Sequence, residues 1–201
     1  MTAEAVSLEM ERRSLPDWAF PPPGGFKAED LDHIPDLPAH TELIDGSLVF
    51  VSPQASFHML VVDLLVTALR RCAPDDVLVR REMSVILDED LRPEPDVCVI
   101  RADAEKSLRQ TFYRGSQVLL AIEVVSPESR RRDRQRKPVL YAEAGIPHFW
   151  LVEDHDEKPV VHVFELQPAT RTYAPSGVFH DRLKLTVPFD IDIDLTEIER
   201  I

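Results

Sequence analysis

The chain has 201 residues, of which 44% are hydrophobic, so it can fold as one domain with a substantial core. Its 23 basic and 36 acidic residues give a formal net charge of −13, which excludes general electrostatic attraction to nucleic acid. Any contact with a polyanion has to be local or bridged by metal cations. Cys72 and Cys98 are too few for a disulfide framework or a cysteine-based zinc site, and they indicate a reducing compartment. No apolar run reaches the roughly 18 residues of a membrane-spanning helix, and the first residues lack the apolar stretch of a signal peptide, so we expect a cytoplasmic protein.

Residues 1–26 are polar and end in "FPPPGGF", a run of proline and glycine that starts no regular element. We interpret them as a flexible or surface-wrapped lead-in to a single domain over residues 27–201. A short helix is expected over residues 27–35. The pair "DG" between the apolar runs of "TELIDGSLVFVS" predicts a β-hairpin over residues 41–52. Apolar residues at helical spacing then predict the first long helix, over residues 56–73.

The middle and end of the chain alternate between strands and one further helix. Apolar runs predict strands over residues 76–87, 95–101 and 117–126. A helix is expected over residues 129–145, because Ser129 can cap its start and Gly145, followed by Pro147, ends it. Beyond it we expect a hairpin, two short strands and a final turn: residues 147–155 with 159–166, then 172–174, 182–187 and 195–200. This order predicts an α/β domain built on a mixed sheet.

Two acids stand on predicted strands. "RPEPDVCVI" places Asp96 at the start of one strand, and "AIEVV" places Glu123 within another. Two carboxylates on adjacent strands can hold one hard cation, because Mg²⁺ takes oxygen ligands, and such a cation activates water. A lone aspartate at a strand end is more often a turn or capping residue. Glu123 is harder to explain in that way, because "VLLAIEVV" is apolar on both faces and burial of an unpaired charge is costly.

The helix that follows is strongly basic, since six of the eight side chains in "RRRDRQRK", residues 130–137, are cationic. Regular helical spacing predicts one stripe on this helix, made of Arg130, Asp133, Arg134, Lys137 and Tyr141. It predicts that three other arginines mostly point elsewhere: Arg131, Arg132 and Arg136. The alternative is a solvated helix face with a local ion pair between Asp133 and Lys137. The helix begins directly after the Glu123 strand, at the strand end where α/β sheets place ligands.

Four segments together resemble a known family: "ELIDGSLVFVSP", the histidine at position 58, "PEPDVCVI" and "AIEVVSPESRRRDRQRKPVLYAEAGIPHFWLVE". The chain is similar, over roughly residues 40–198, to the Uma-type family of putative restriction endonucleases, bacterial proteins with the PD-(D/E)xK nuclease fold. The resemblance implies a restriction-endonuclease-like mixed β-sheet core flanked by helices, with β additions at both ends.

The resemblance also implies roles for single residues. Asp96, after Pro95, matches the "PD" half of the motif, and Glu123 matches the acidic residue of the other half. Val125 stands where the motif has its lysine. In similar proteins the lysine is displaced onto the following helix, where Lys137 stands in this chain. The implied catalytic residues are therefore Asp96, Glu123 and Lys137.

Further residues complete the implied site. Glu42 matches the early acid of the family and joins Asp96 and Glu123 as a ligand of Mg²⁺ or Mn²⁺. His58 and Asp133 are expected in supporting positions. Arg130 and Arg134 are expected to contact the phosphates of the substrate, since the basic helix supplies the positive potential that the acidic chain lacks.

The resulting hypothesis is a metal-dependent endonuclease that hydrolyses DNA phosphodiester bonds. A homodimer is expected, because cutting both strands of a duplex suits two active sites, and no membrane contact is expected. The alternative is a non-catalytic relic of the fold that acts as a binding or interaction module. The net charge and Val125 favour the relic, whereas the joint presence of four residues favours the enzyme: Glu42, Asp96, Glu123 and Lys137. No residue distinguishes DNA from RNA as substrate.

Overall fold

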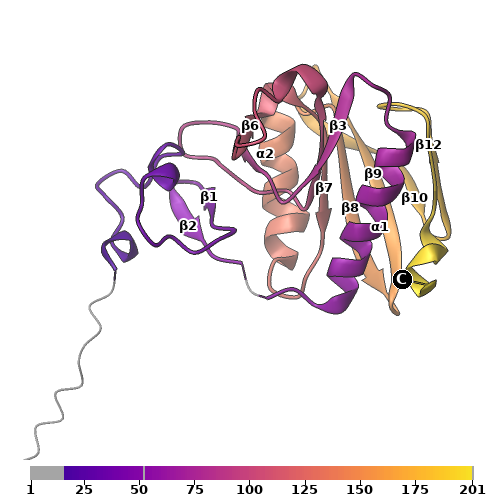
Figure 1. The fold of residues 1–201 in the computed structure, drawn as a ribbon, viewed down its shortest axis with the longest axis horizontal. Coiled ribbons are helices and arrows are strands. Elements are labelled where there is room, and N and C mark those ends of the chain that lie inside the picture. The colour runs from indigo at the N-terminus through magenta and orange to yellow at the C-terminus, as the bar shows by residue number, and fades with distance from the viewer. Residues whose placement is uncertain (1–15, 52, 201) are drawn as a thin grey trace, which may run out of the picture.

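The centre of the computed structural model, which describes residues 16–51 and 53–200, is a mixed β-sheet (Figure 1). Among the described residues six strands form it, in the spatial order β10-β9-β8-β7-β5-β3. Their bounds are β3 Val77–Arg81, β5 Val97–Arg101, β7 Val118–Val124, β8 His148–His155, β9 Lys158–Gln167 and β10 Thr172–Phe179. Strands β7 and β8 run parallel, and the other neighbouring pairs are antiparallel. The mixed α/β fold predicted from the sequence is confirmed.

Two helices cover opposite faces of this sheet. Helix α1, Ser56–Cys72, buries apolar side chains such as Val61 and Leu65 in one cluster that also contains Val99 and Ile122. Helix α2, Lys137–Glu143, contributes Tyr141 to a second cluster that contains Cys98, Ala121 and Phe149. Because successive side chains of a strand point to opposite faces, β5 and β7 are apolar on both. The helices predicted over residues 56–73 and 129–145 are therefore present, and apolar side chains pack against both faces of the sheet between them.

Strand β7 connects to β8 through α2, the crossover that parallel neighbours require. Gly145 ends this connection with a φ of +81°, in the left-handed region that favours glycine after a helix. On its other side β7 pairs with β5, in a register that sets Val97 against Ile122. Asp96 therefore stands opposite Glu123, and opposed residues of an antiparallel pair share a face. The shared face is the one that α2 covers.

The N-terminal part forms the predicted hairpin, β1 Glu42–Ile44 with β2 Ser47–Val49, beside the main sheet (Figure 1). Its turn residues Asp45 and Gly46 both have positive φ, as a two-residue hairpin turn requires. Of the predicted lead-in, residues 1–15 lie outside the described residues. The remainder packs on the hairpin, since the Trp18 ring lies 5.3 Å from that of Phe50.

Three predicted elements are wrong in extent. The strand expected over residues 172–174 continues to Phe179 as β10. The helix expected over residues 27–35 is reduced to a 3-10 turn, Asp30–Asp32, whose start is held by the Lys27 amide donating to Asp30 Oδ2. The strand expected over residues 76–87 is broken after β3, because Glu82 takes a φ of +50° and its amide donates to the Asp96 carbonyl. Strand β4, Ser84–Ile86, then leaves the main sheet and pairs in parallel with β6, Phe112–Arg114.

The remaining elements are one more hairpin and several 3-10 turns. Strands β11, Arg182–Leu185, and β12, Ile191–Asp194, form a hairpin whose apolar side chains pack in the α1 cluster. The other 3-10 turns are Asp17–Ala19, Ala102–Ala104, Gly115–Gln117 and Leu195–Arg200. Within residues 16–51 and 53–200, no helix is long and apolar enough to cross a membrane.

One ion pair fastens the edge strand β3 to the loop after β5. The Arg80 guanidinium donates to both carboxylate oxygens of Glu105, each at 2.7 Å, and the Tyr113 hydroxyl donates to the same carboxylate. These hydrogen bonds lower the pKa of Glu105 to about 2, and the largest contribution comes from Arg80. Because an unfolded glutamate titrates near 4.5, the stabilisation is complete above that pH and is lost as the pH falls towards 2.

We therefore expect Glu105→Gln to destabilise the protein relative to wild type near neutral pH, and the difference to shrink as the pH is lowered. Urea unfolding of both proteins at about pH 6 and at about pH 3 measures it. A difference in unfolding free energy that stays constant between these two pH values would contradict the assigned interaction.

Candidate active site

Asp96 directly precedes the first residue of β5, Val97, and is held by two groups from different elements. Its Oδ2 accepts a hydrogen bond of 2.6 Å from the Val124 amide at the end of β7. Its Oδ1 lies 3.0 Å from Nε2 of His58, in the first turn of α1. Both contacts fix the orientation of the carboxylate, and His58 is itself buried. The structure thus brings two of the predicted site residues, Asp96 and His58, into direct contact.

Glu123 is 2% exposed, and both of its carboxylate oxygens have partners. Oε2 accepts a hydrogen bond of 2.9 Å from the Lys137 ammonium, and Oε1 accepts one of 2.5 Å from the Tyr141 hydroxyl. Charged hydrogen bonds of this kind offset the cost of burying a carboxylate in an apolar strand. Tyr141 is a site residue that the sequence analysis placed on the right helix stripe without assigning it a role.

Lys137 is the centre of the cluster. The residue as a whole is 3% exposed. Its ammonium lies 2.7 Å from Glu42 Oε1 on the N-terminal hairpin and 3.8 Å from Asp133 Oδ1 on its own helical segment. Val125, at the usual lysine position, instead packs in the α2-side apolar cluster. The ammonium therefore reaches the strand carboxylate from the helix, fourteen residues further along the chain.

A π-helical turn, Arg132–Arg136, directly precedes α2 and sets which side chains face the site. The predicted stripe assumed regular α-helical spacing, and a π-turn, with hydrogen bonds from i to i+5, breaks that spacing. Asp133 and Lys137 still face inwards. The prediction that Arg132 points elsewhere is wrong, because its Nε lies 3.3 Å from Glu42 Oε2. Arg134 points outwards to Glu153, at 2.6 Å, and Arg130 is exposed.

Glu94 is a second residue that the sequence analysis missed. Its amide donates a hydrogen bond of 2.9 Å to Glu42 Oε1, and its carboxylate contacts His40 Nδ1 at 2.5 Å. The signal was its position two residues before Asp96, which returns it to the same side of an extended segment. Glu94 therefore links the hairpin acid Glu42 to the strand that carries Asp96.

The cluster holds more negative than positive charge, and the protonation of its members follows from this. Burial, together with the neighbouring carboxylates Asp133, Asp96 and Glu42, raises the pKa of Glu123 well above its usual value despite Lys137. Burial also raises the pKa of Asp133. Burial alone would lower the pKa of Lys137, but Glu123 and Glu42 outweigh it, so the pKa of this ammonium is raised. Lys137 stays charged, and the carboxylates compete for the one buried cation.

The donor set fits a hard divalent cation in composition. Oε2 of Glu42 and Oδ1 of Asp133 are buried without a hydrogen-bond partner, and carboxylate oxygens are the ligands that Mg²⁺ prefers. The two oxygens of Glu123 retain lone pairs, since an ionised carboxylate has about four acceptor sites. Among the described residues, no three His, Cys, Asp or Glu side chains are already placed to hold a metal ion. The Lys137 ammonium lies 2.7 Å from Glu42 and 2.9 Å from Glu123.

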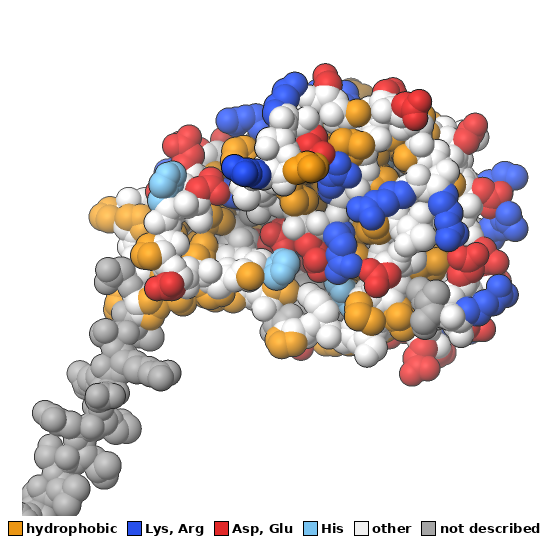
Figure 2. All heavy atoms as spheres, viewed as in Figure 1, with side chains coloured by type: hydrophobic (Ala, Val, Ile, Leu, Met, Phe, Trp, Pro, Cys, Tyr) orange, Lys and Arg blue, Asp and Glu red, His pale blue; other side chains and the backbone are white. Residues whose placement is uncertain are grey.

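A cavity of about 30 Å³, lined by the cluster, leads to the surface. It has room for a water-sized species. Figure 2 shows acidic, basic and histidine side chains grouped at the centre of this face, between the N-terminal part and the sheet. Four carboxylates from four segments of the chain, one buried ammonium and a small polar cavity make up a candidate active site.

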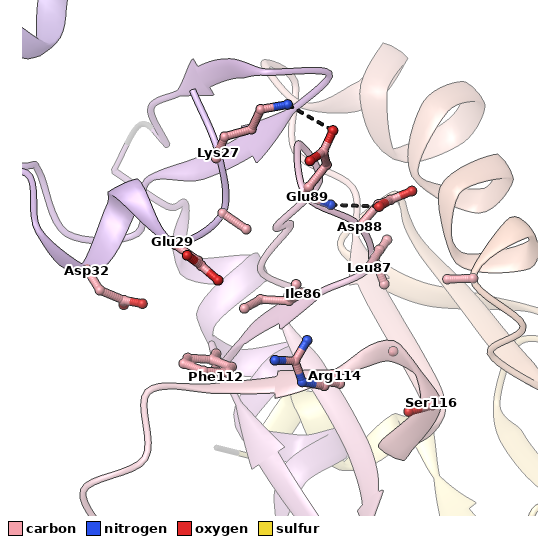
Figure 3. A pocket seen from close by; sticks show the side chains of 13 residues that line it. Lys27, Glu29, Asp32, Ile86, Leu87, Asp88, Glu89, Phe112, Arg114 and Ser116 are labelled. Atoms are coloured by element: carbon pink, nitrogen blue, oxygen red, sulfur yellow. Dashed lines mark hydrogen bonds and ion pairs between the residues drawn. The ribbon is translucent and has the colours of Figure 1, made fainter. Parts of the chain in front are cut away.

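A larger hollow, of about 610 Å³, lies elsewhere, between residues 27–32 and the β4–β6 pair. Figure 3 shows Lys27 paired with Glu89 at its edge, with Ile86 and Phe112 along it. That ion pair is 3.0 Å long, and Asp32 is likewise paired, with Arg92 at 2.8 Å. The carboxylate cluster lines no part of this hollow, so its size does not make it the candidate active site.

Comparisons with known proteins identify the family and the fold. Residues 28–196 match the sequence profile of the Uma2 family, described as putative restriction endonucleases. The fold is similar to that of a putative nuclease belonging to DUF820 from Anabaena variabilis ATCC 29413, with a TM-score of 0.65 and 13% identity, over 86% of this chain and 97% of that chain. At that identity the likeness shows the fold alone. No curated protein matches the chain.

Removing the buried ammonium tests the electrostatic description of the site. We expect Lys137→Met to lower the free energy of unfolding by about 3–5 kcal/mol near neutral pH, because breaking a buried ion pair leaves the carboxylates uncompensated. Urea unfolding measures the loss. As a control, Lys158→Met removes an ammonium that lies 3.6 Å from Glu199, and the side chain of Lys158 is 64% exposed. This control should change the free energy of unfolding by less than about 0.5 kcal/mol. Equal effects of the two substitutions would refute the role given to Lys137.

Proposed function

The chain belongs to the Uma2 family of putative restriction endonucleases, and on that premise we propose that it is a metal-dependent endonuclease that hydrolyses the phosphodiester bonds of DNA. The observation that carries the proposal is the Lys137 ammonium, 2.7 Å from Glu42 and 2.9 Å from Glu123, inside a group of carboxylates that it does not neutralise. An apolar fold gains nothing from such a cluster, since buried charges are costly even when paired. A site that receives a cation and a phosphate group has a use for it.

Asp96, Glu123 and Glu42 are the residues that would hold Mg²⁺ or Mn²⁺ in this proposal. The metal, when bound, would polarise the phosphodiester and lower the pKa of a water molecule. Its positive charge would also compensate the excess of carboxylates. His58 holds Asp96 in place through a contact of 3.0 Å, and Asp133 faces Lys137 from one turn earlier on the helical segment.

Lys137 has two tasks in the proposal. It keeps Glu42 and Glu123 together although they lie on a hairpin and a strand that are far apart in the sequence. As an ammonium with a raised pKa, it also carries positive charge at any physiological pH, and so favours a phosphate oxygen beside the carboxylates. Tyr141 fixes the other oxygen of Glu123 and so keeps that carboxylate aimed at the ammonium.

The cellular setting is part of the proposal. Both cysteines are free thiols, Cys98 being buried, which suits a reducing cytoplasm. We also propose a homodimer, because two active sites suit the cleavage of both strands of a duplex. Light scattering coupled to size-exclusion chromatography distinguishes a dimer from a monomer of 22.9 kDa.

A second candidate is a non-catalytic module that keeps the fold. It is favoured by one observation, that both oxygens of Glu123 already accept hydrogen bonds from Lys137 and Tyr141. A module of this kind would bind its partner without a divalent cation and would cleave nothing. The same experiment decides between the two candidates.

We expect Glu123→Gln to abolish Mg²⁺-dependent nicking of plasmid DNA and to leave the fold intact. The substitution keeps the shape of the side chain and removes the charge that a hard cation requires. Because it also removes one of the competing carboxylates, stability without metal should be unchanged or slightly raised. Added Mg²⁺ should raise the melting temperature of the wild type and hardly that of the variant, since a ligand stabilises only the state that binds it.

Glu143→Gln is the matched control, an exposed carboxylate on the same helix α2. It should cleave and melt as the wild type does. Equal cleavage by the Glu123 and Glu143 variants would remove Glu123 from the site. The non-catalytic module would instead show no cleavage by any of the three proteins and no effect of Mg²⁺ on melting.

A further inference from the structure

We propose that Arg132, together with Arg131 and Gln135, forms a phosphate-binding subsite beside the carboxylate cluster. Its ligand is a backbone phosphodiester of a nucleic acid strand, next to the bond that is cut. The identity of the ligand as a nucleic acid strand rests on the proposed function. The choice of residues rests on their positions and contacts. It moves the expected phosphate contacts from Arg130 and Arg134 to the π-turn.

The first observation is the position of Arg132 between two hollows. It lines the small cavity of the carboxylate cluster, and it also lines a surface hollow of about 450 Å³ formed with Glu128, Arg131, Gln135 and Arg136. Of the residues that line the surface hollow, Arg132 alone also lines the cavity. A phosphate in the surface hollow would therefore lie next to a phosphate at the carboxylates.

The second observation is how loosely Arg132 is held. Its Nε is buried without a hydrogen-bond partner, and its closest carboxylate oxygen, Glu42 Oε2 at 3.3 Å, is likewise without one. The two groups attract each other but do not form a hydrogen bond. A guanidinium has five N–H donors in a planar fork that matches the oxygens of a phosphate. An orphaned donor at the mouth of a polar cavity is a group that a bound anion would satisfy.

The third observation is that neighbouring arginines already have partners. Arg134 Nε donates to Glu153 Oε1 at 2.6 Å, on the side away from the hollow. Arg136 forms a two-bond ion pair with Asp45 of the hairpin turn. In each pair the carboxylate already compensates the charge of the guanidinium, which lowers its attraction for a phosphate. Arg132 has the weakest partner of the three, so a phosphate gains most there.

The fourth observation is that the other side of the carboxylate cluster is acidic. A hollow of about 340 Å³ adjoins the cluster at Asp96 and is lined by Glu82 and Glu94, with His40 at its edge. Within the described residues, no lysine or arginine lines it. A phosphate there would meet carboxylates, whereas a phosphate at Arg132 meets guanidinium groups. The neighbouring phosphate of the strand therefore lies on the side of the π-turn.

The test is binding of a fluorescein-labelled single-stranded DNA oligonucleotide to the full chain, measured by anisotropy without divalent cation over a range of NaCl concentrations. We expect Arg132→Met to weaken binding about tenfold and to reduce the slope of log Kd against log salt by about 0.7, the value for one phosphate contact on a single strand. Arg71→Met, an exposed arginine in the last turn of α1, removes the same charge away from the site and should change neither quantity.

Arg132→Lys keeps the proposal testable if the methionine variant does not fold. Lysine preserves the charge but not the planar fork, so binding should weaken while the salt slope stays as in the wild type. Unchanged binding by both Arg132 variants would overturn the subsite. So would loss of binding on substitution of Arg134 with none on substitution of Arg132.

Two further arms separate the proposals. Inorganic phosphate at matched ionic strength should not displace the oligonucleotide; displacement that depends on Arg132 would make this a site for free phosphate and overturn the assignment to a nucleic acid strand. Arg132-dependent binding without cleavage by the wild type would support the subsite and refute the nuclease. Cleavage by Arg132→Met with an unchanged KM would support the nuclease and overturn the subsite.

Discussion

The interaction on which the site depends is the buried Lys137 ammonium between Glu42 and Glu123. It joins the N-terminal hairpin, which is remote in sequence, to the central strand β7 and to the helical segment that follows β7. A buried lysine is costly unless it is paired, and here its partners are the acids that the proposed chemistry requires. The same contact thus fixes the hairpin against the sheet and determines the charge at the site.

The amount of charge explains why this arrangement suits a ligand rather than the stability of the fold. Glu42, Asp96, Glu123 and Asp133 surround one ammonium, and two of their oxygens are buried without a hydrogen bond. A divalent cation would remove this imbalance on one side of the cluster. A phosphate at Arg132 would accept a hydrogen bond from its Nε, which has no hydrogen-bond partner. Cation and phosphate therefore favour each other, as the substrate and cofactor of a nuclease do.

Local patterns in the sequence were sufficient for much of the fold. The "DG" turn, the apolar stripe of α1 and the doubly buried strand β7 each follow from their own residues, because hairpin turns and helical periodicity are short-range signals. The break at Glu82 was missed, because a left-handed glutamate has no marker in the sequence and is held by a contact with the distant Asp96. In the site, the family resemblance was sufficient to predict that Lys137 lies near Glu123. The place of Arg132 could not be predicted, because a π-turn changes which side chains face inwards without changing composition.

The most direct test of the account is a crystal structure of the protein grown with Mn²⁺, with anomalous scattering used to locate the ion. Carboxylates that outnumber their one ammonium should attract the cation. The account predicts an anomalous peak at bonding distance, about 2 Å, from oxygens of Asp96 and Glu123, with Glu42 beside it. The absence of a peak at these carboxylates, with Lys137 still bound between Glu42 and Glu123, would contradict it.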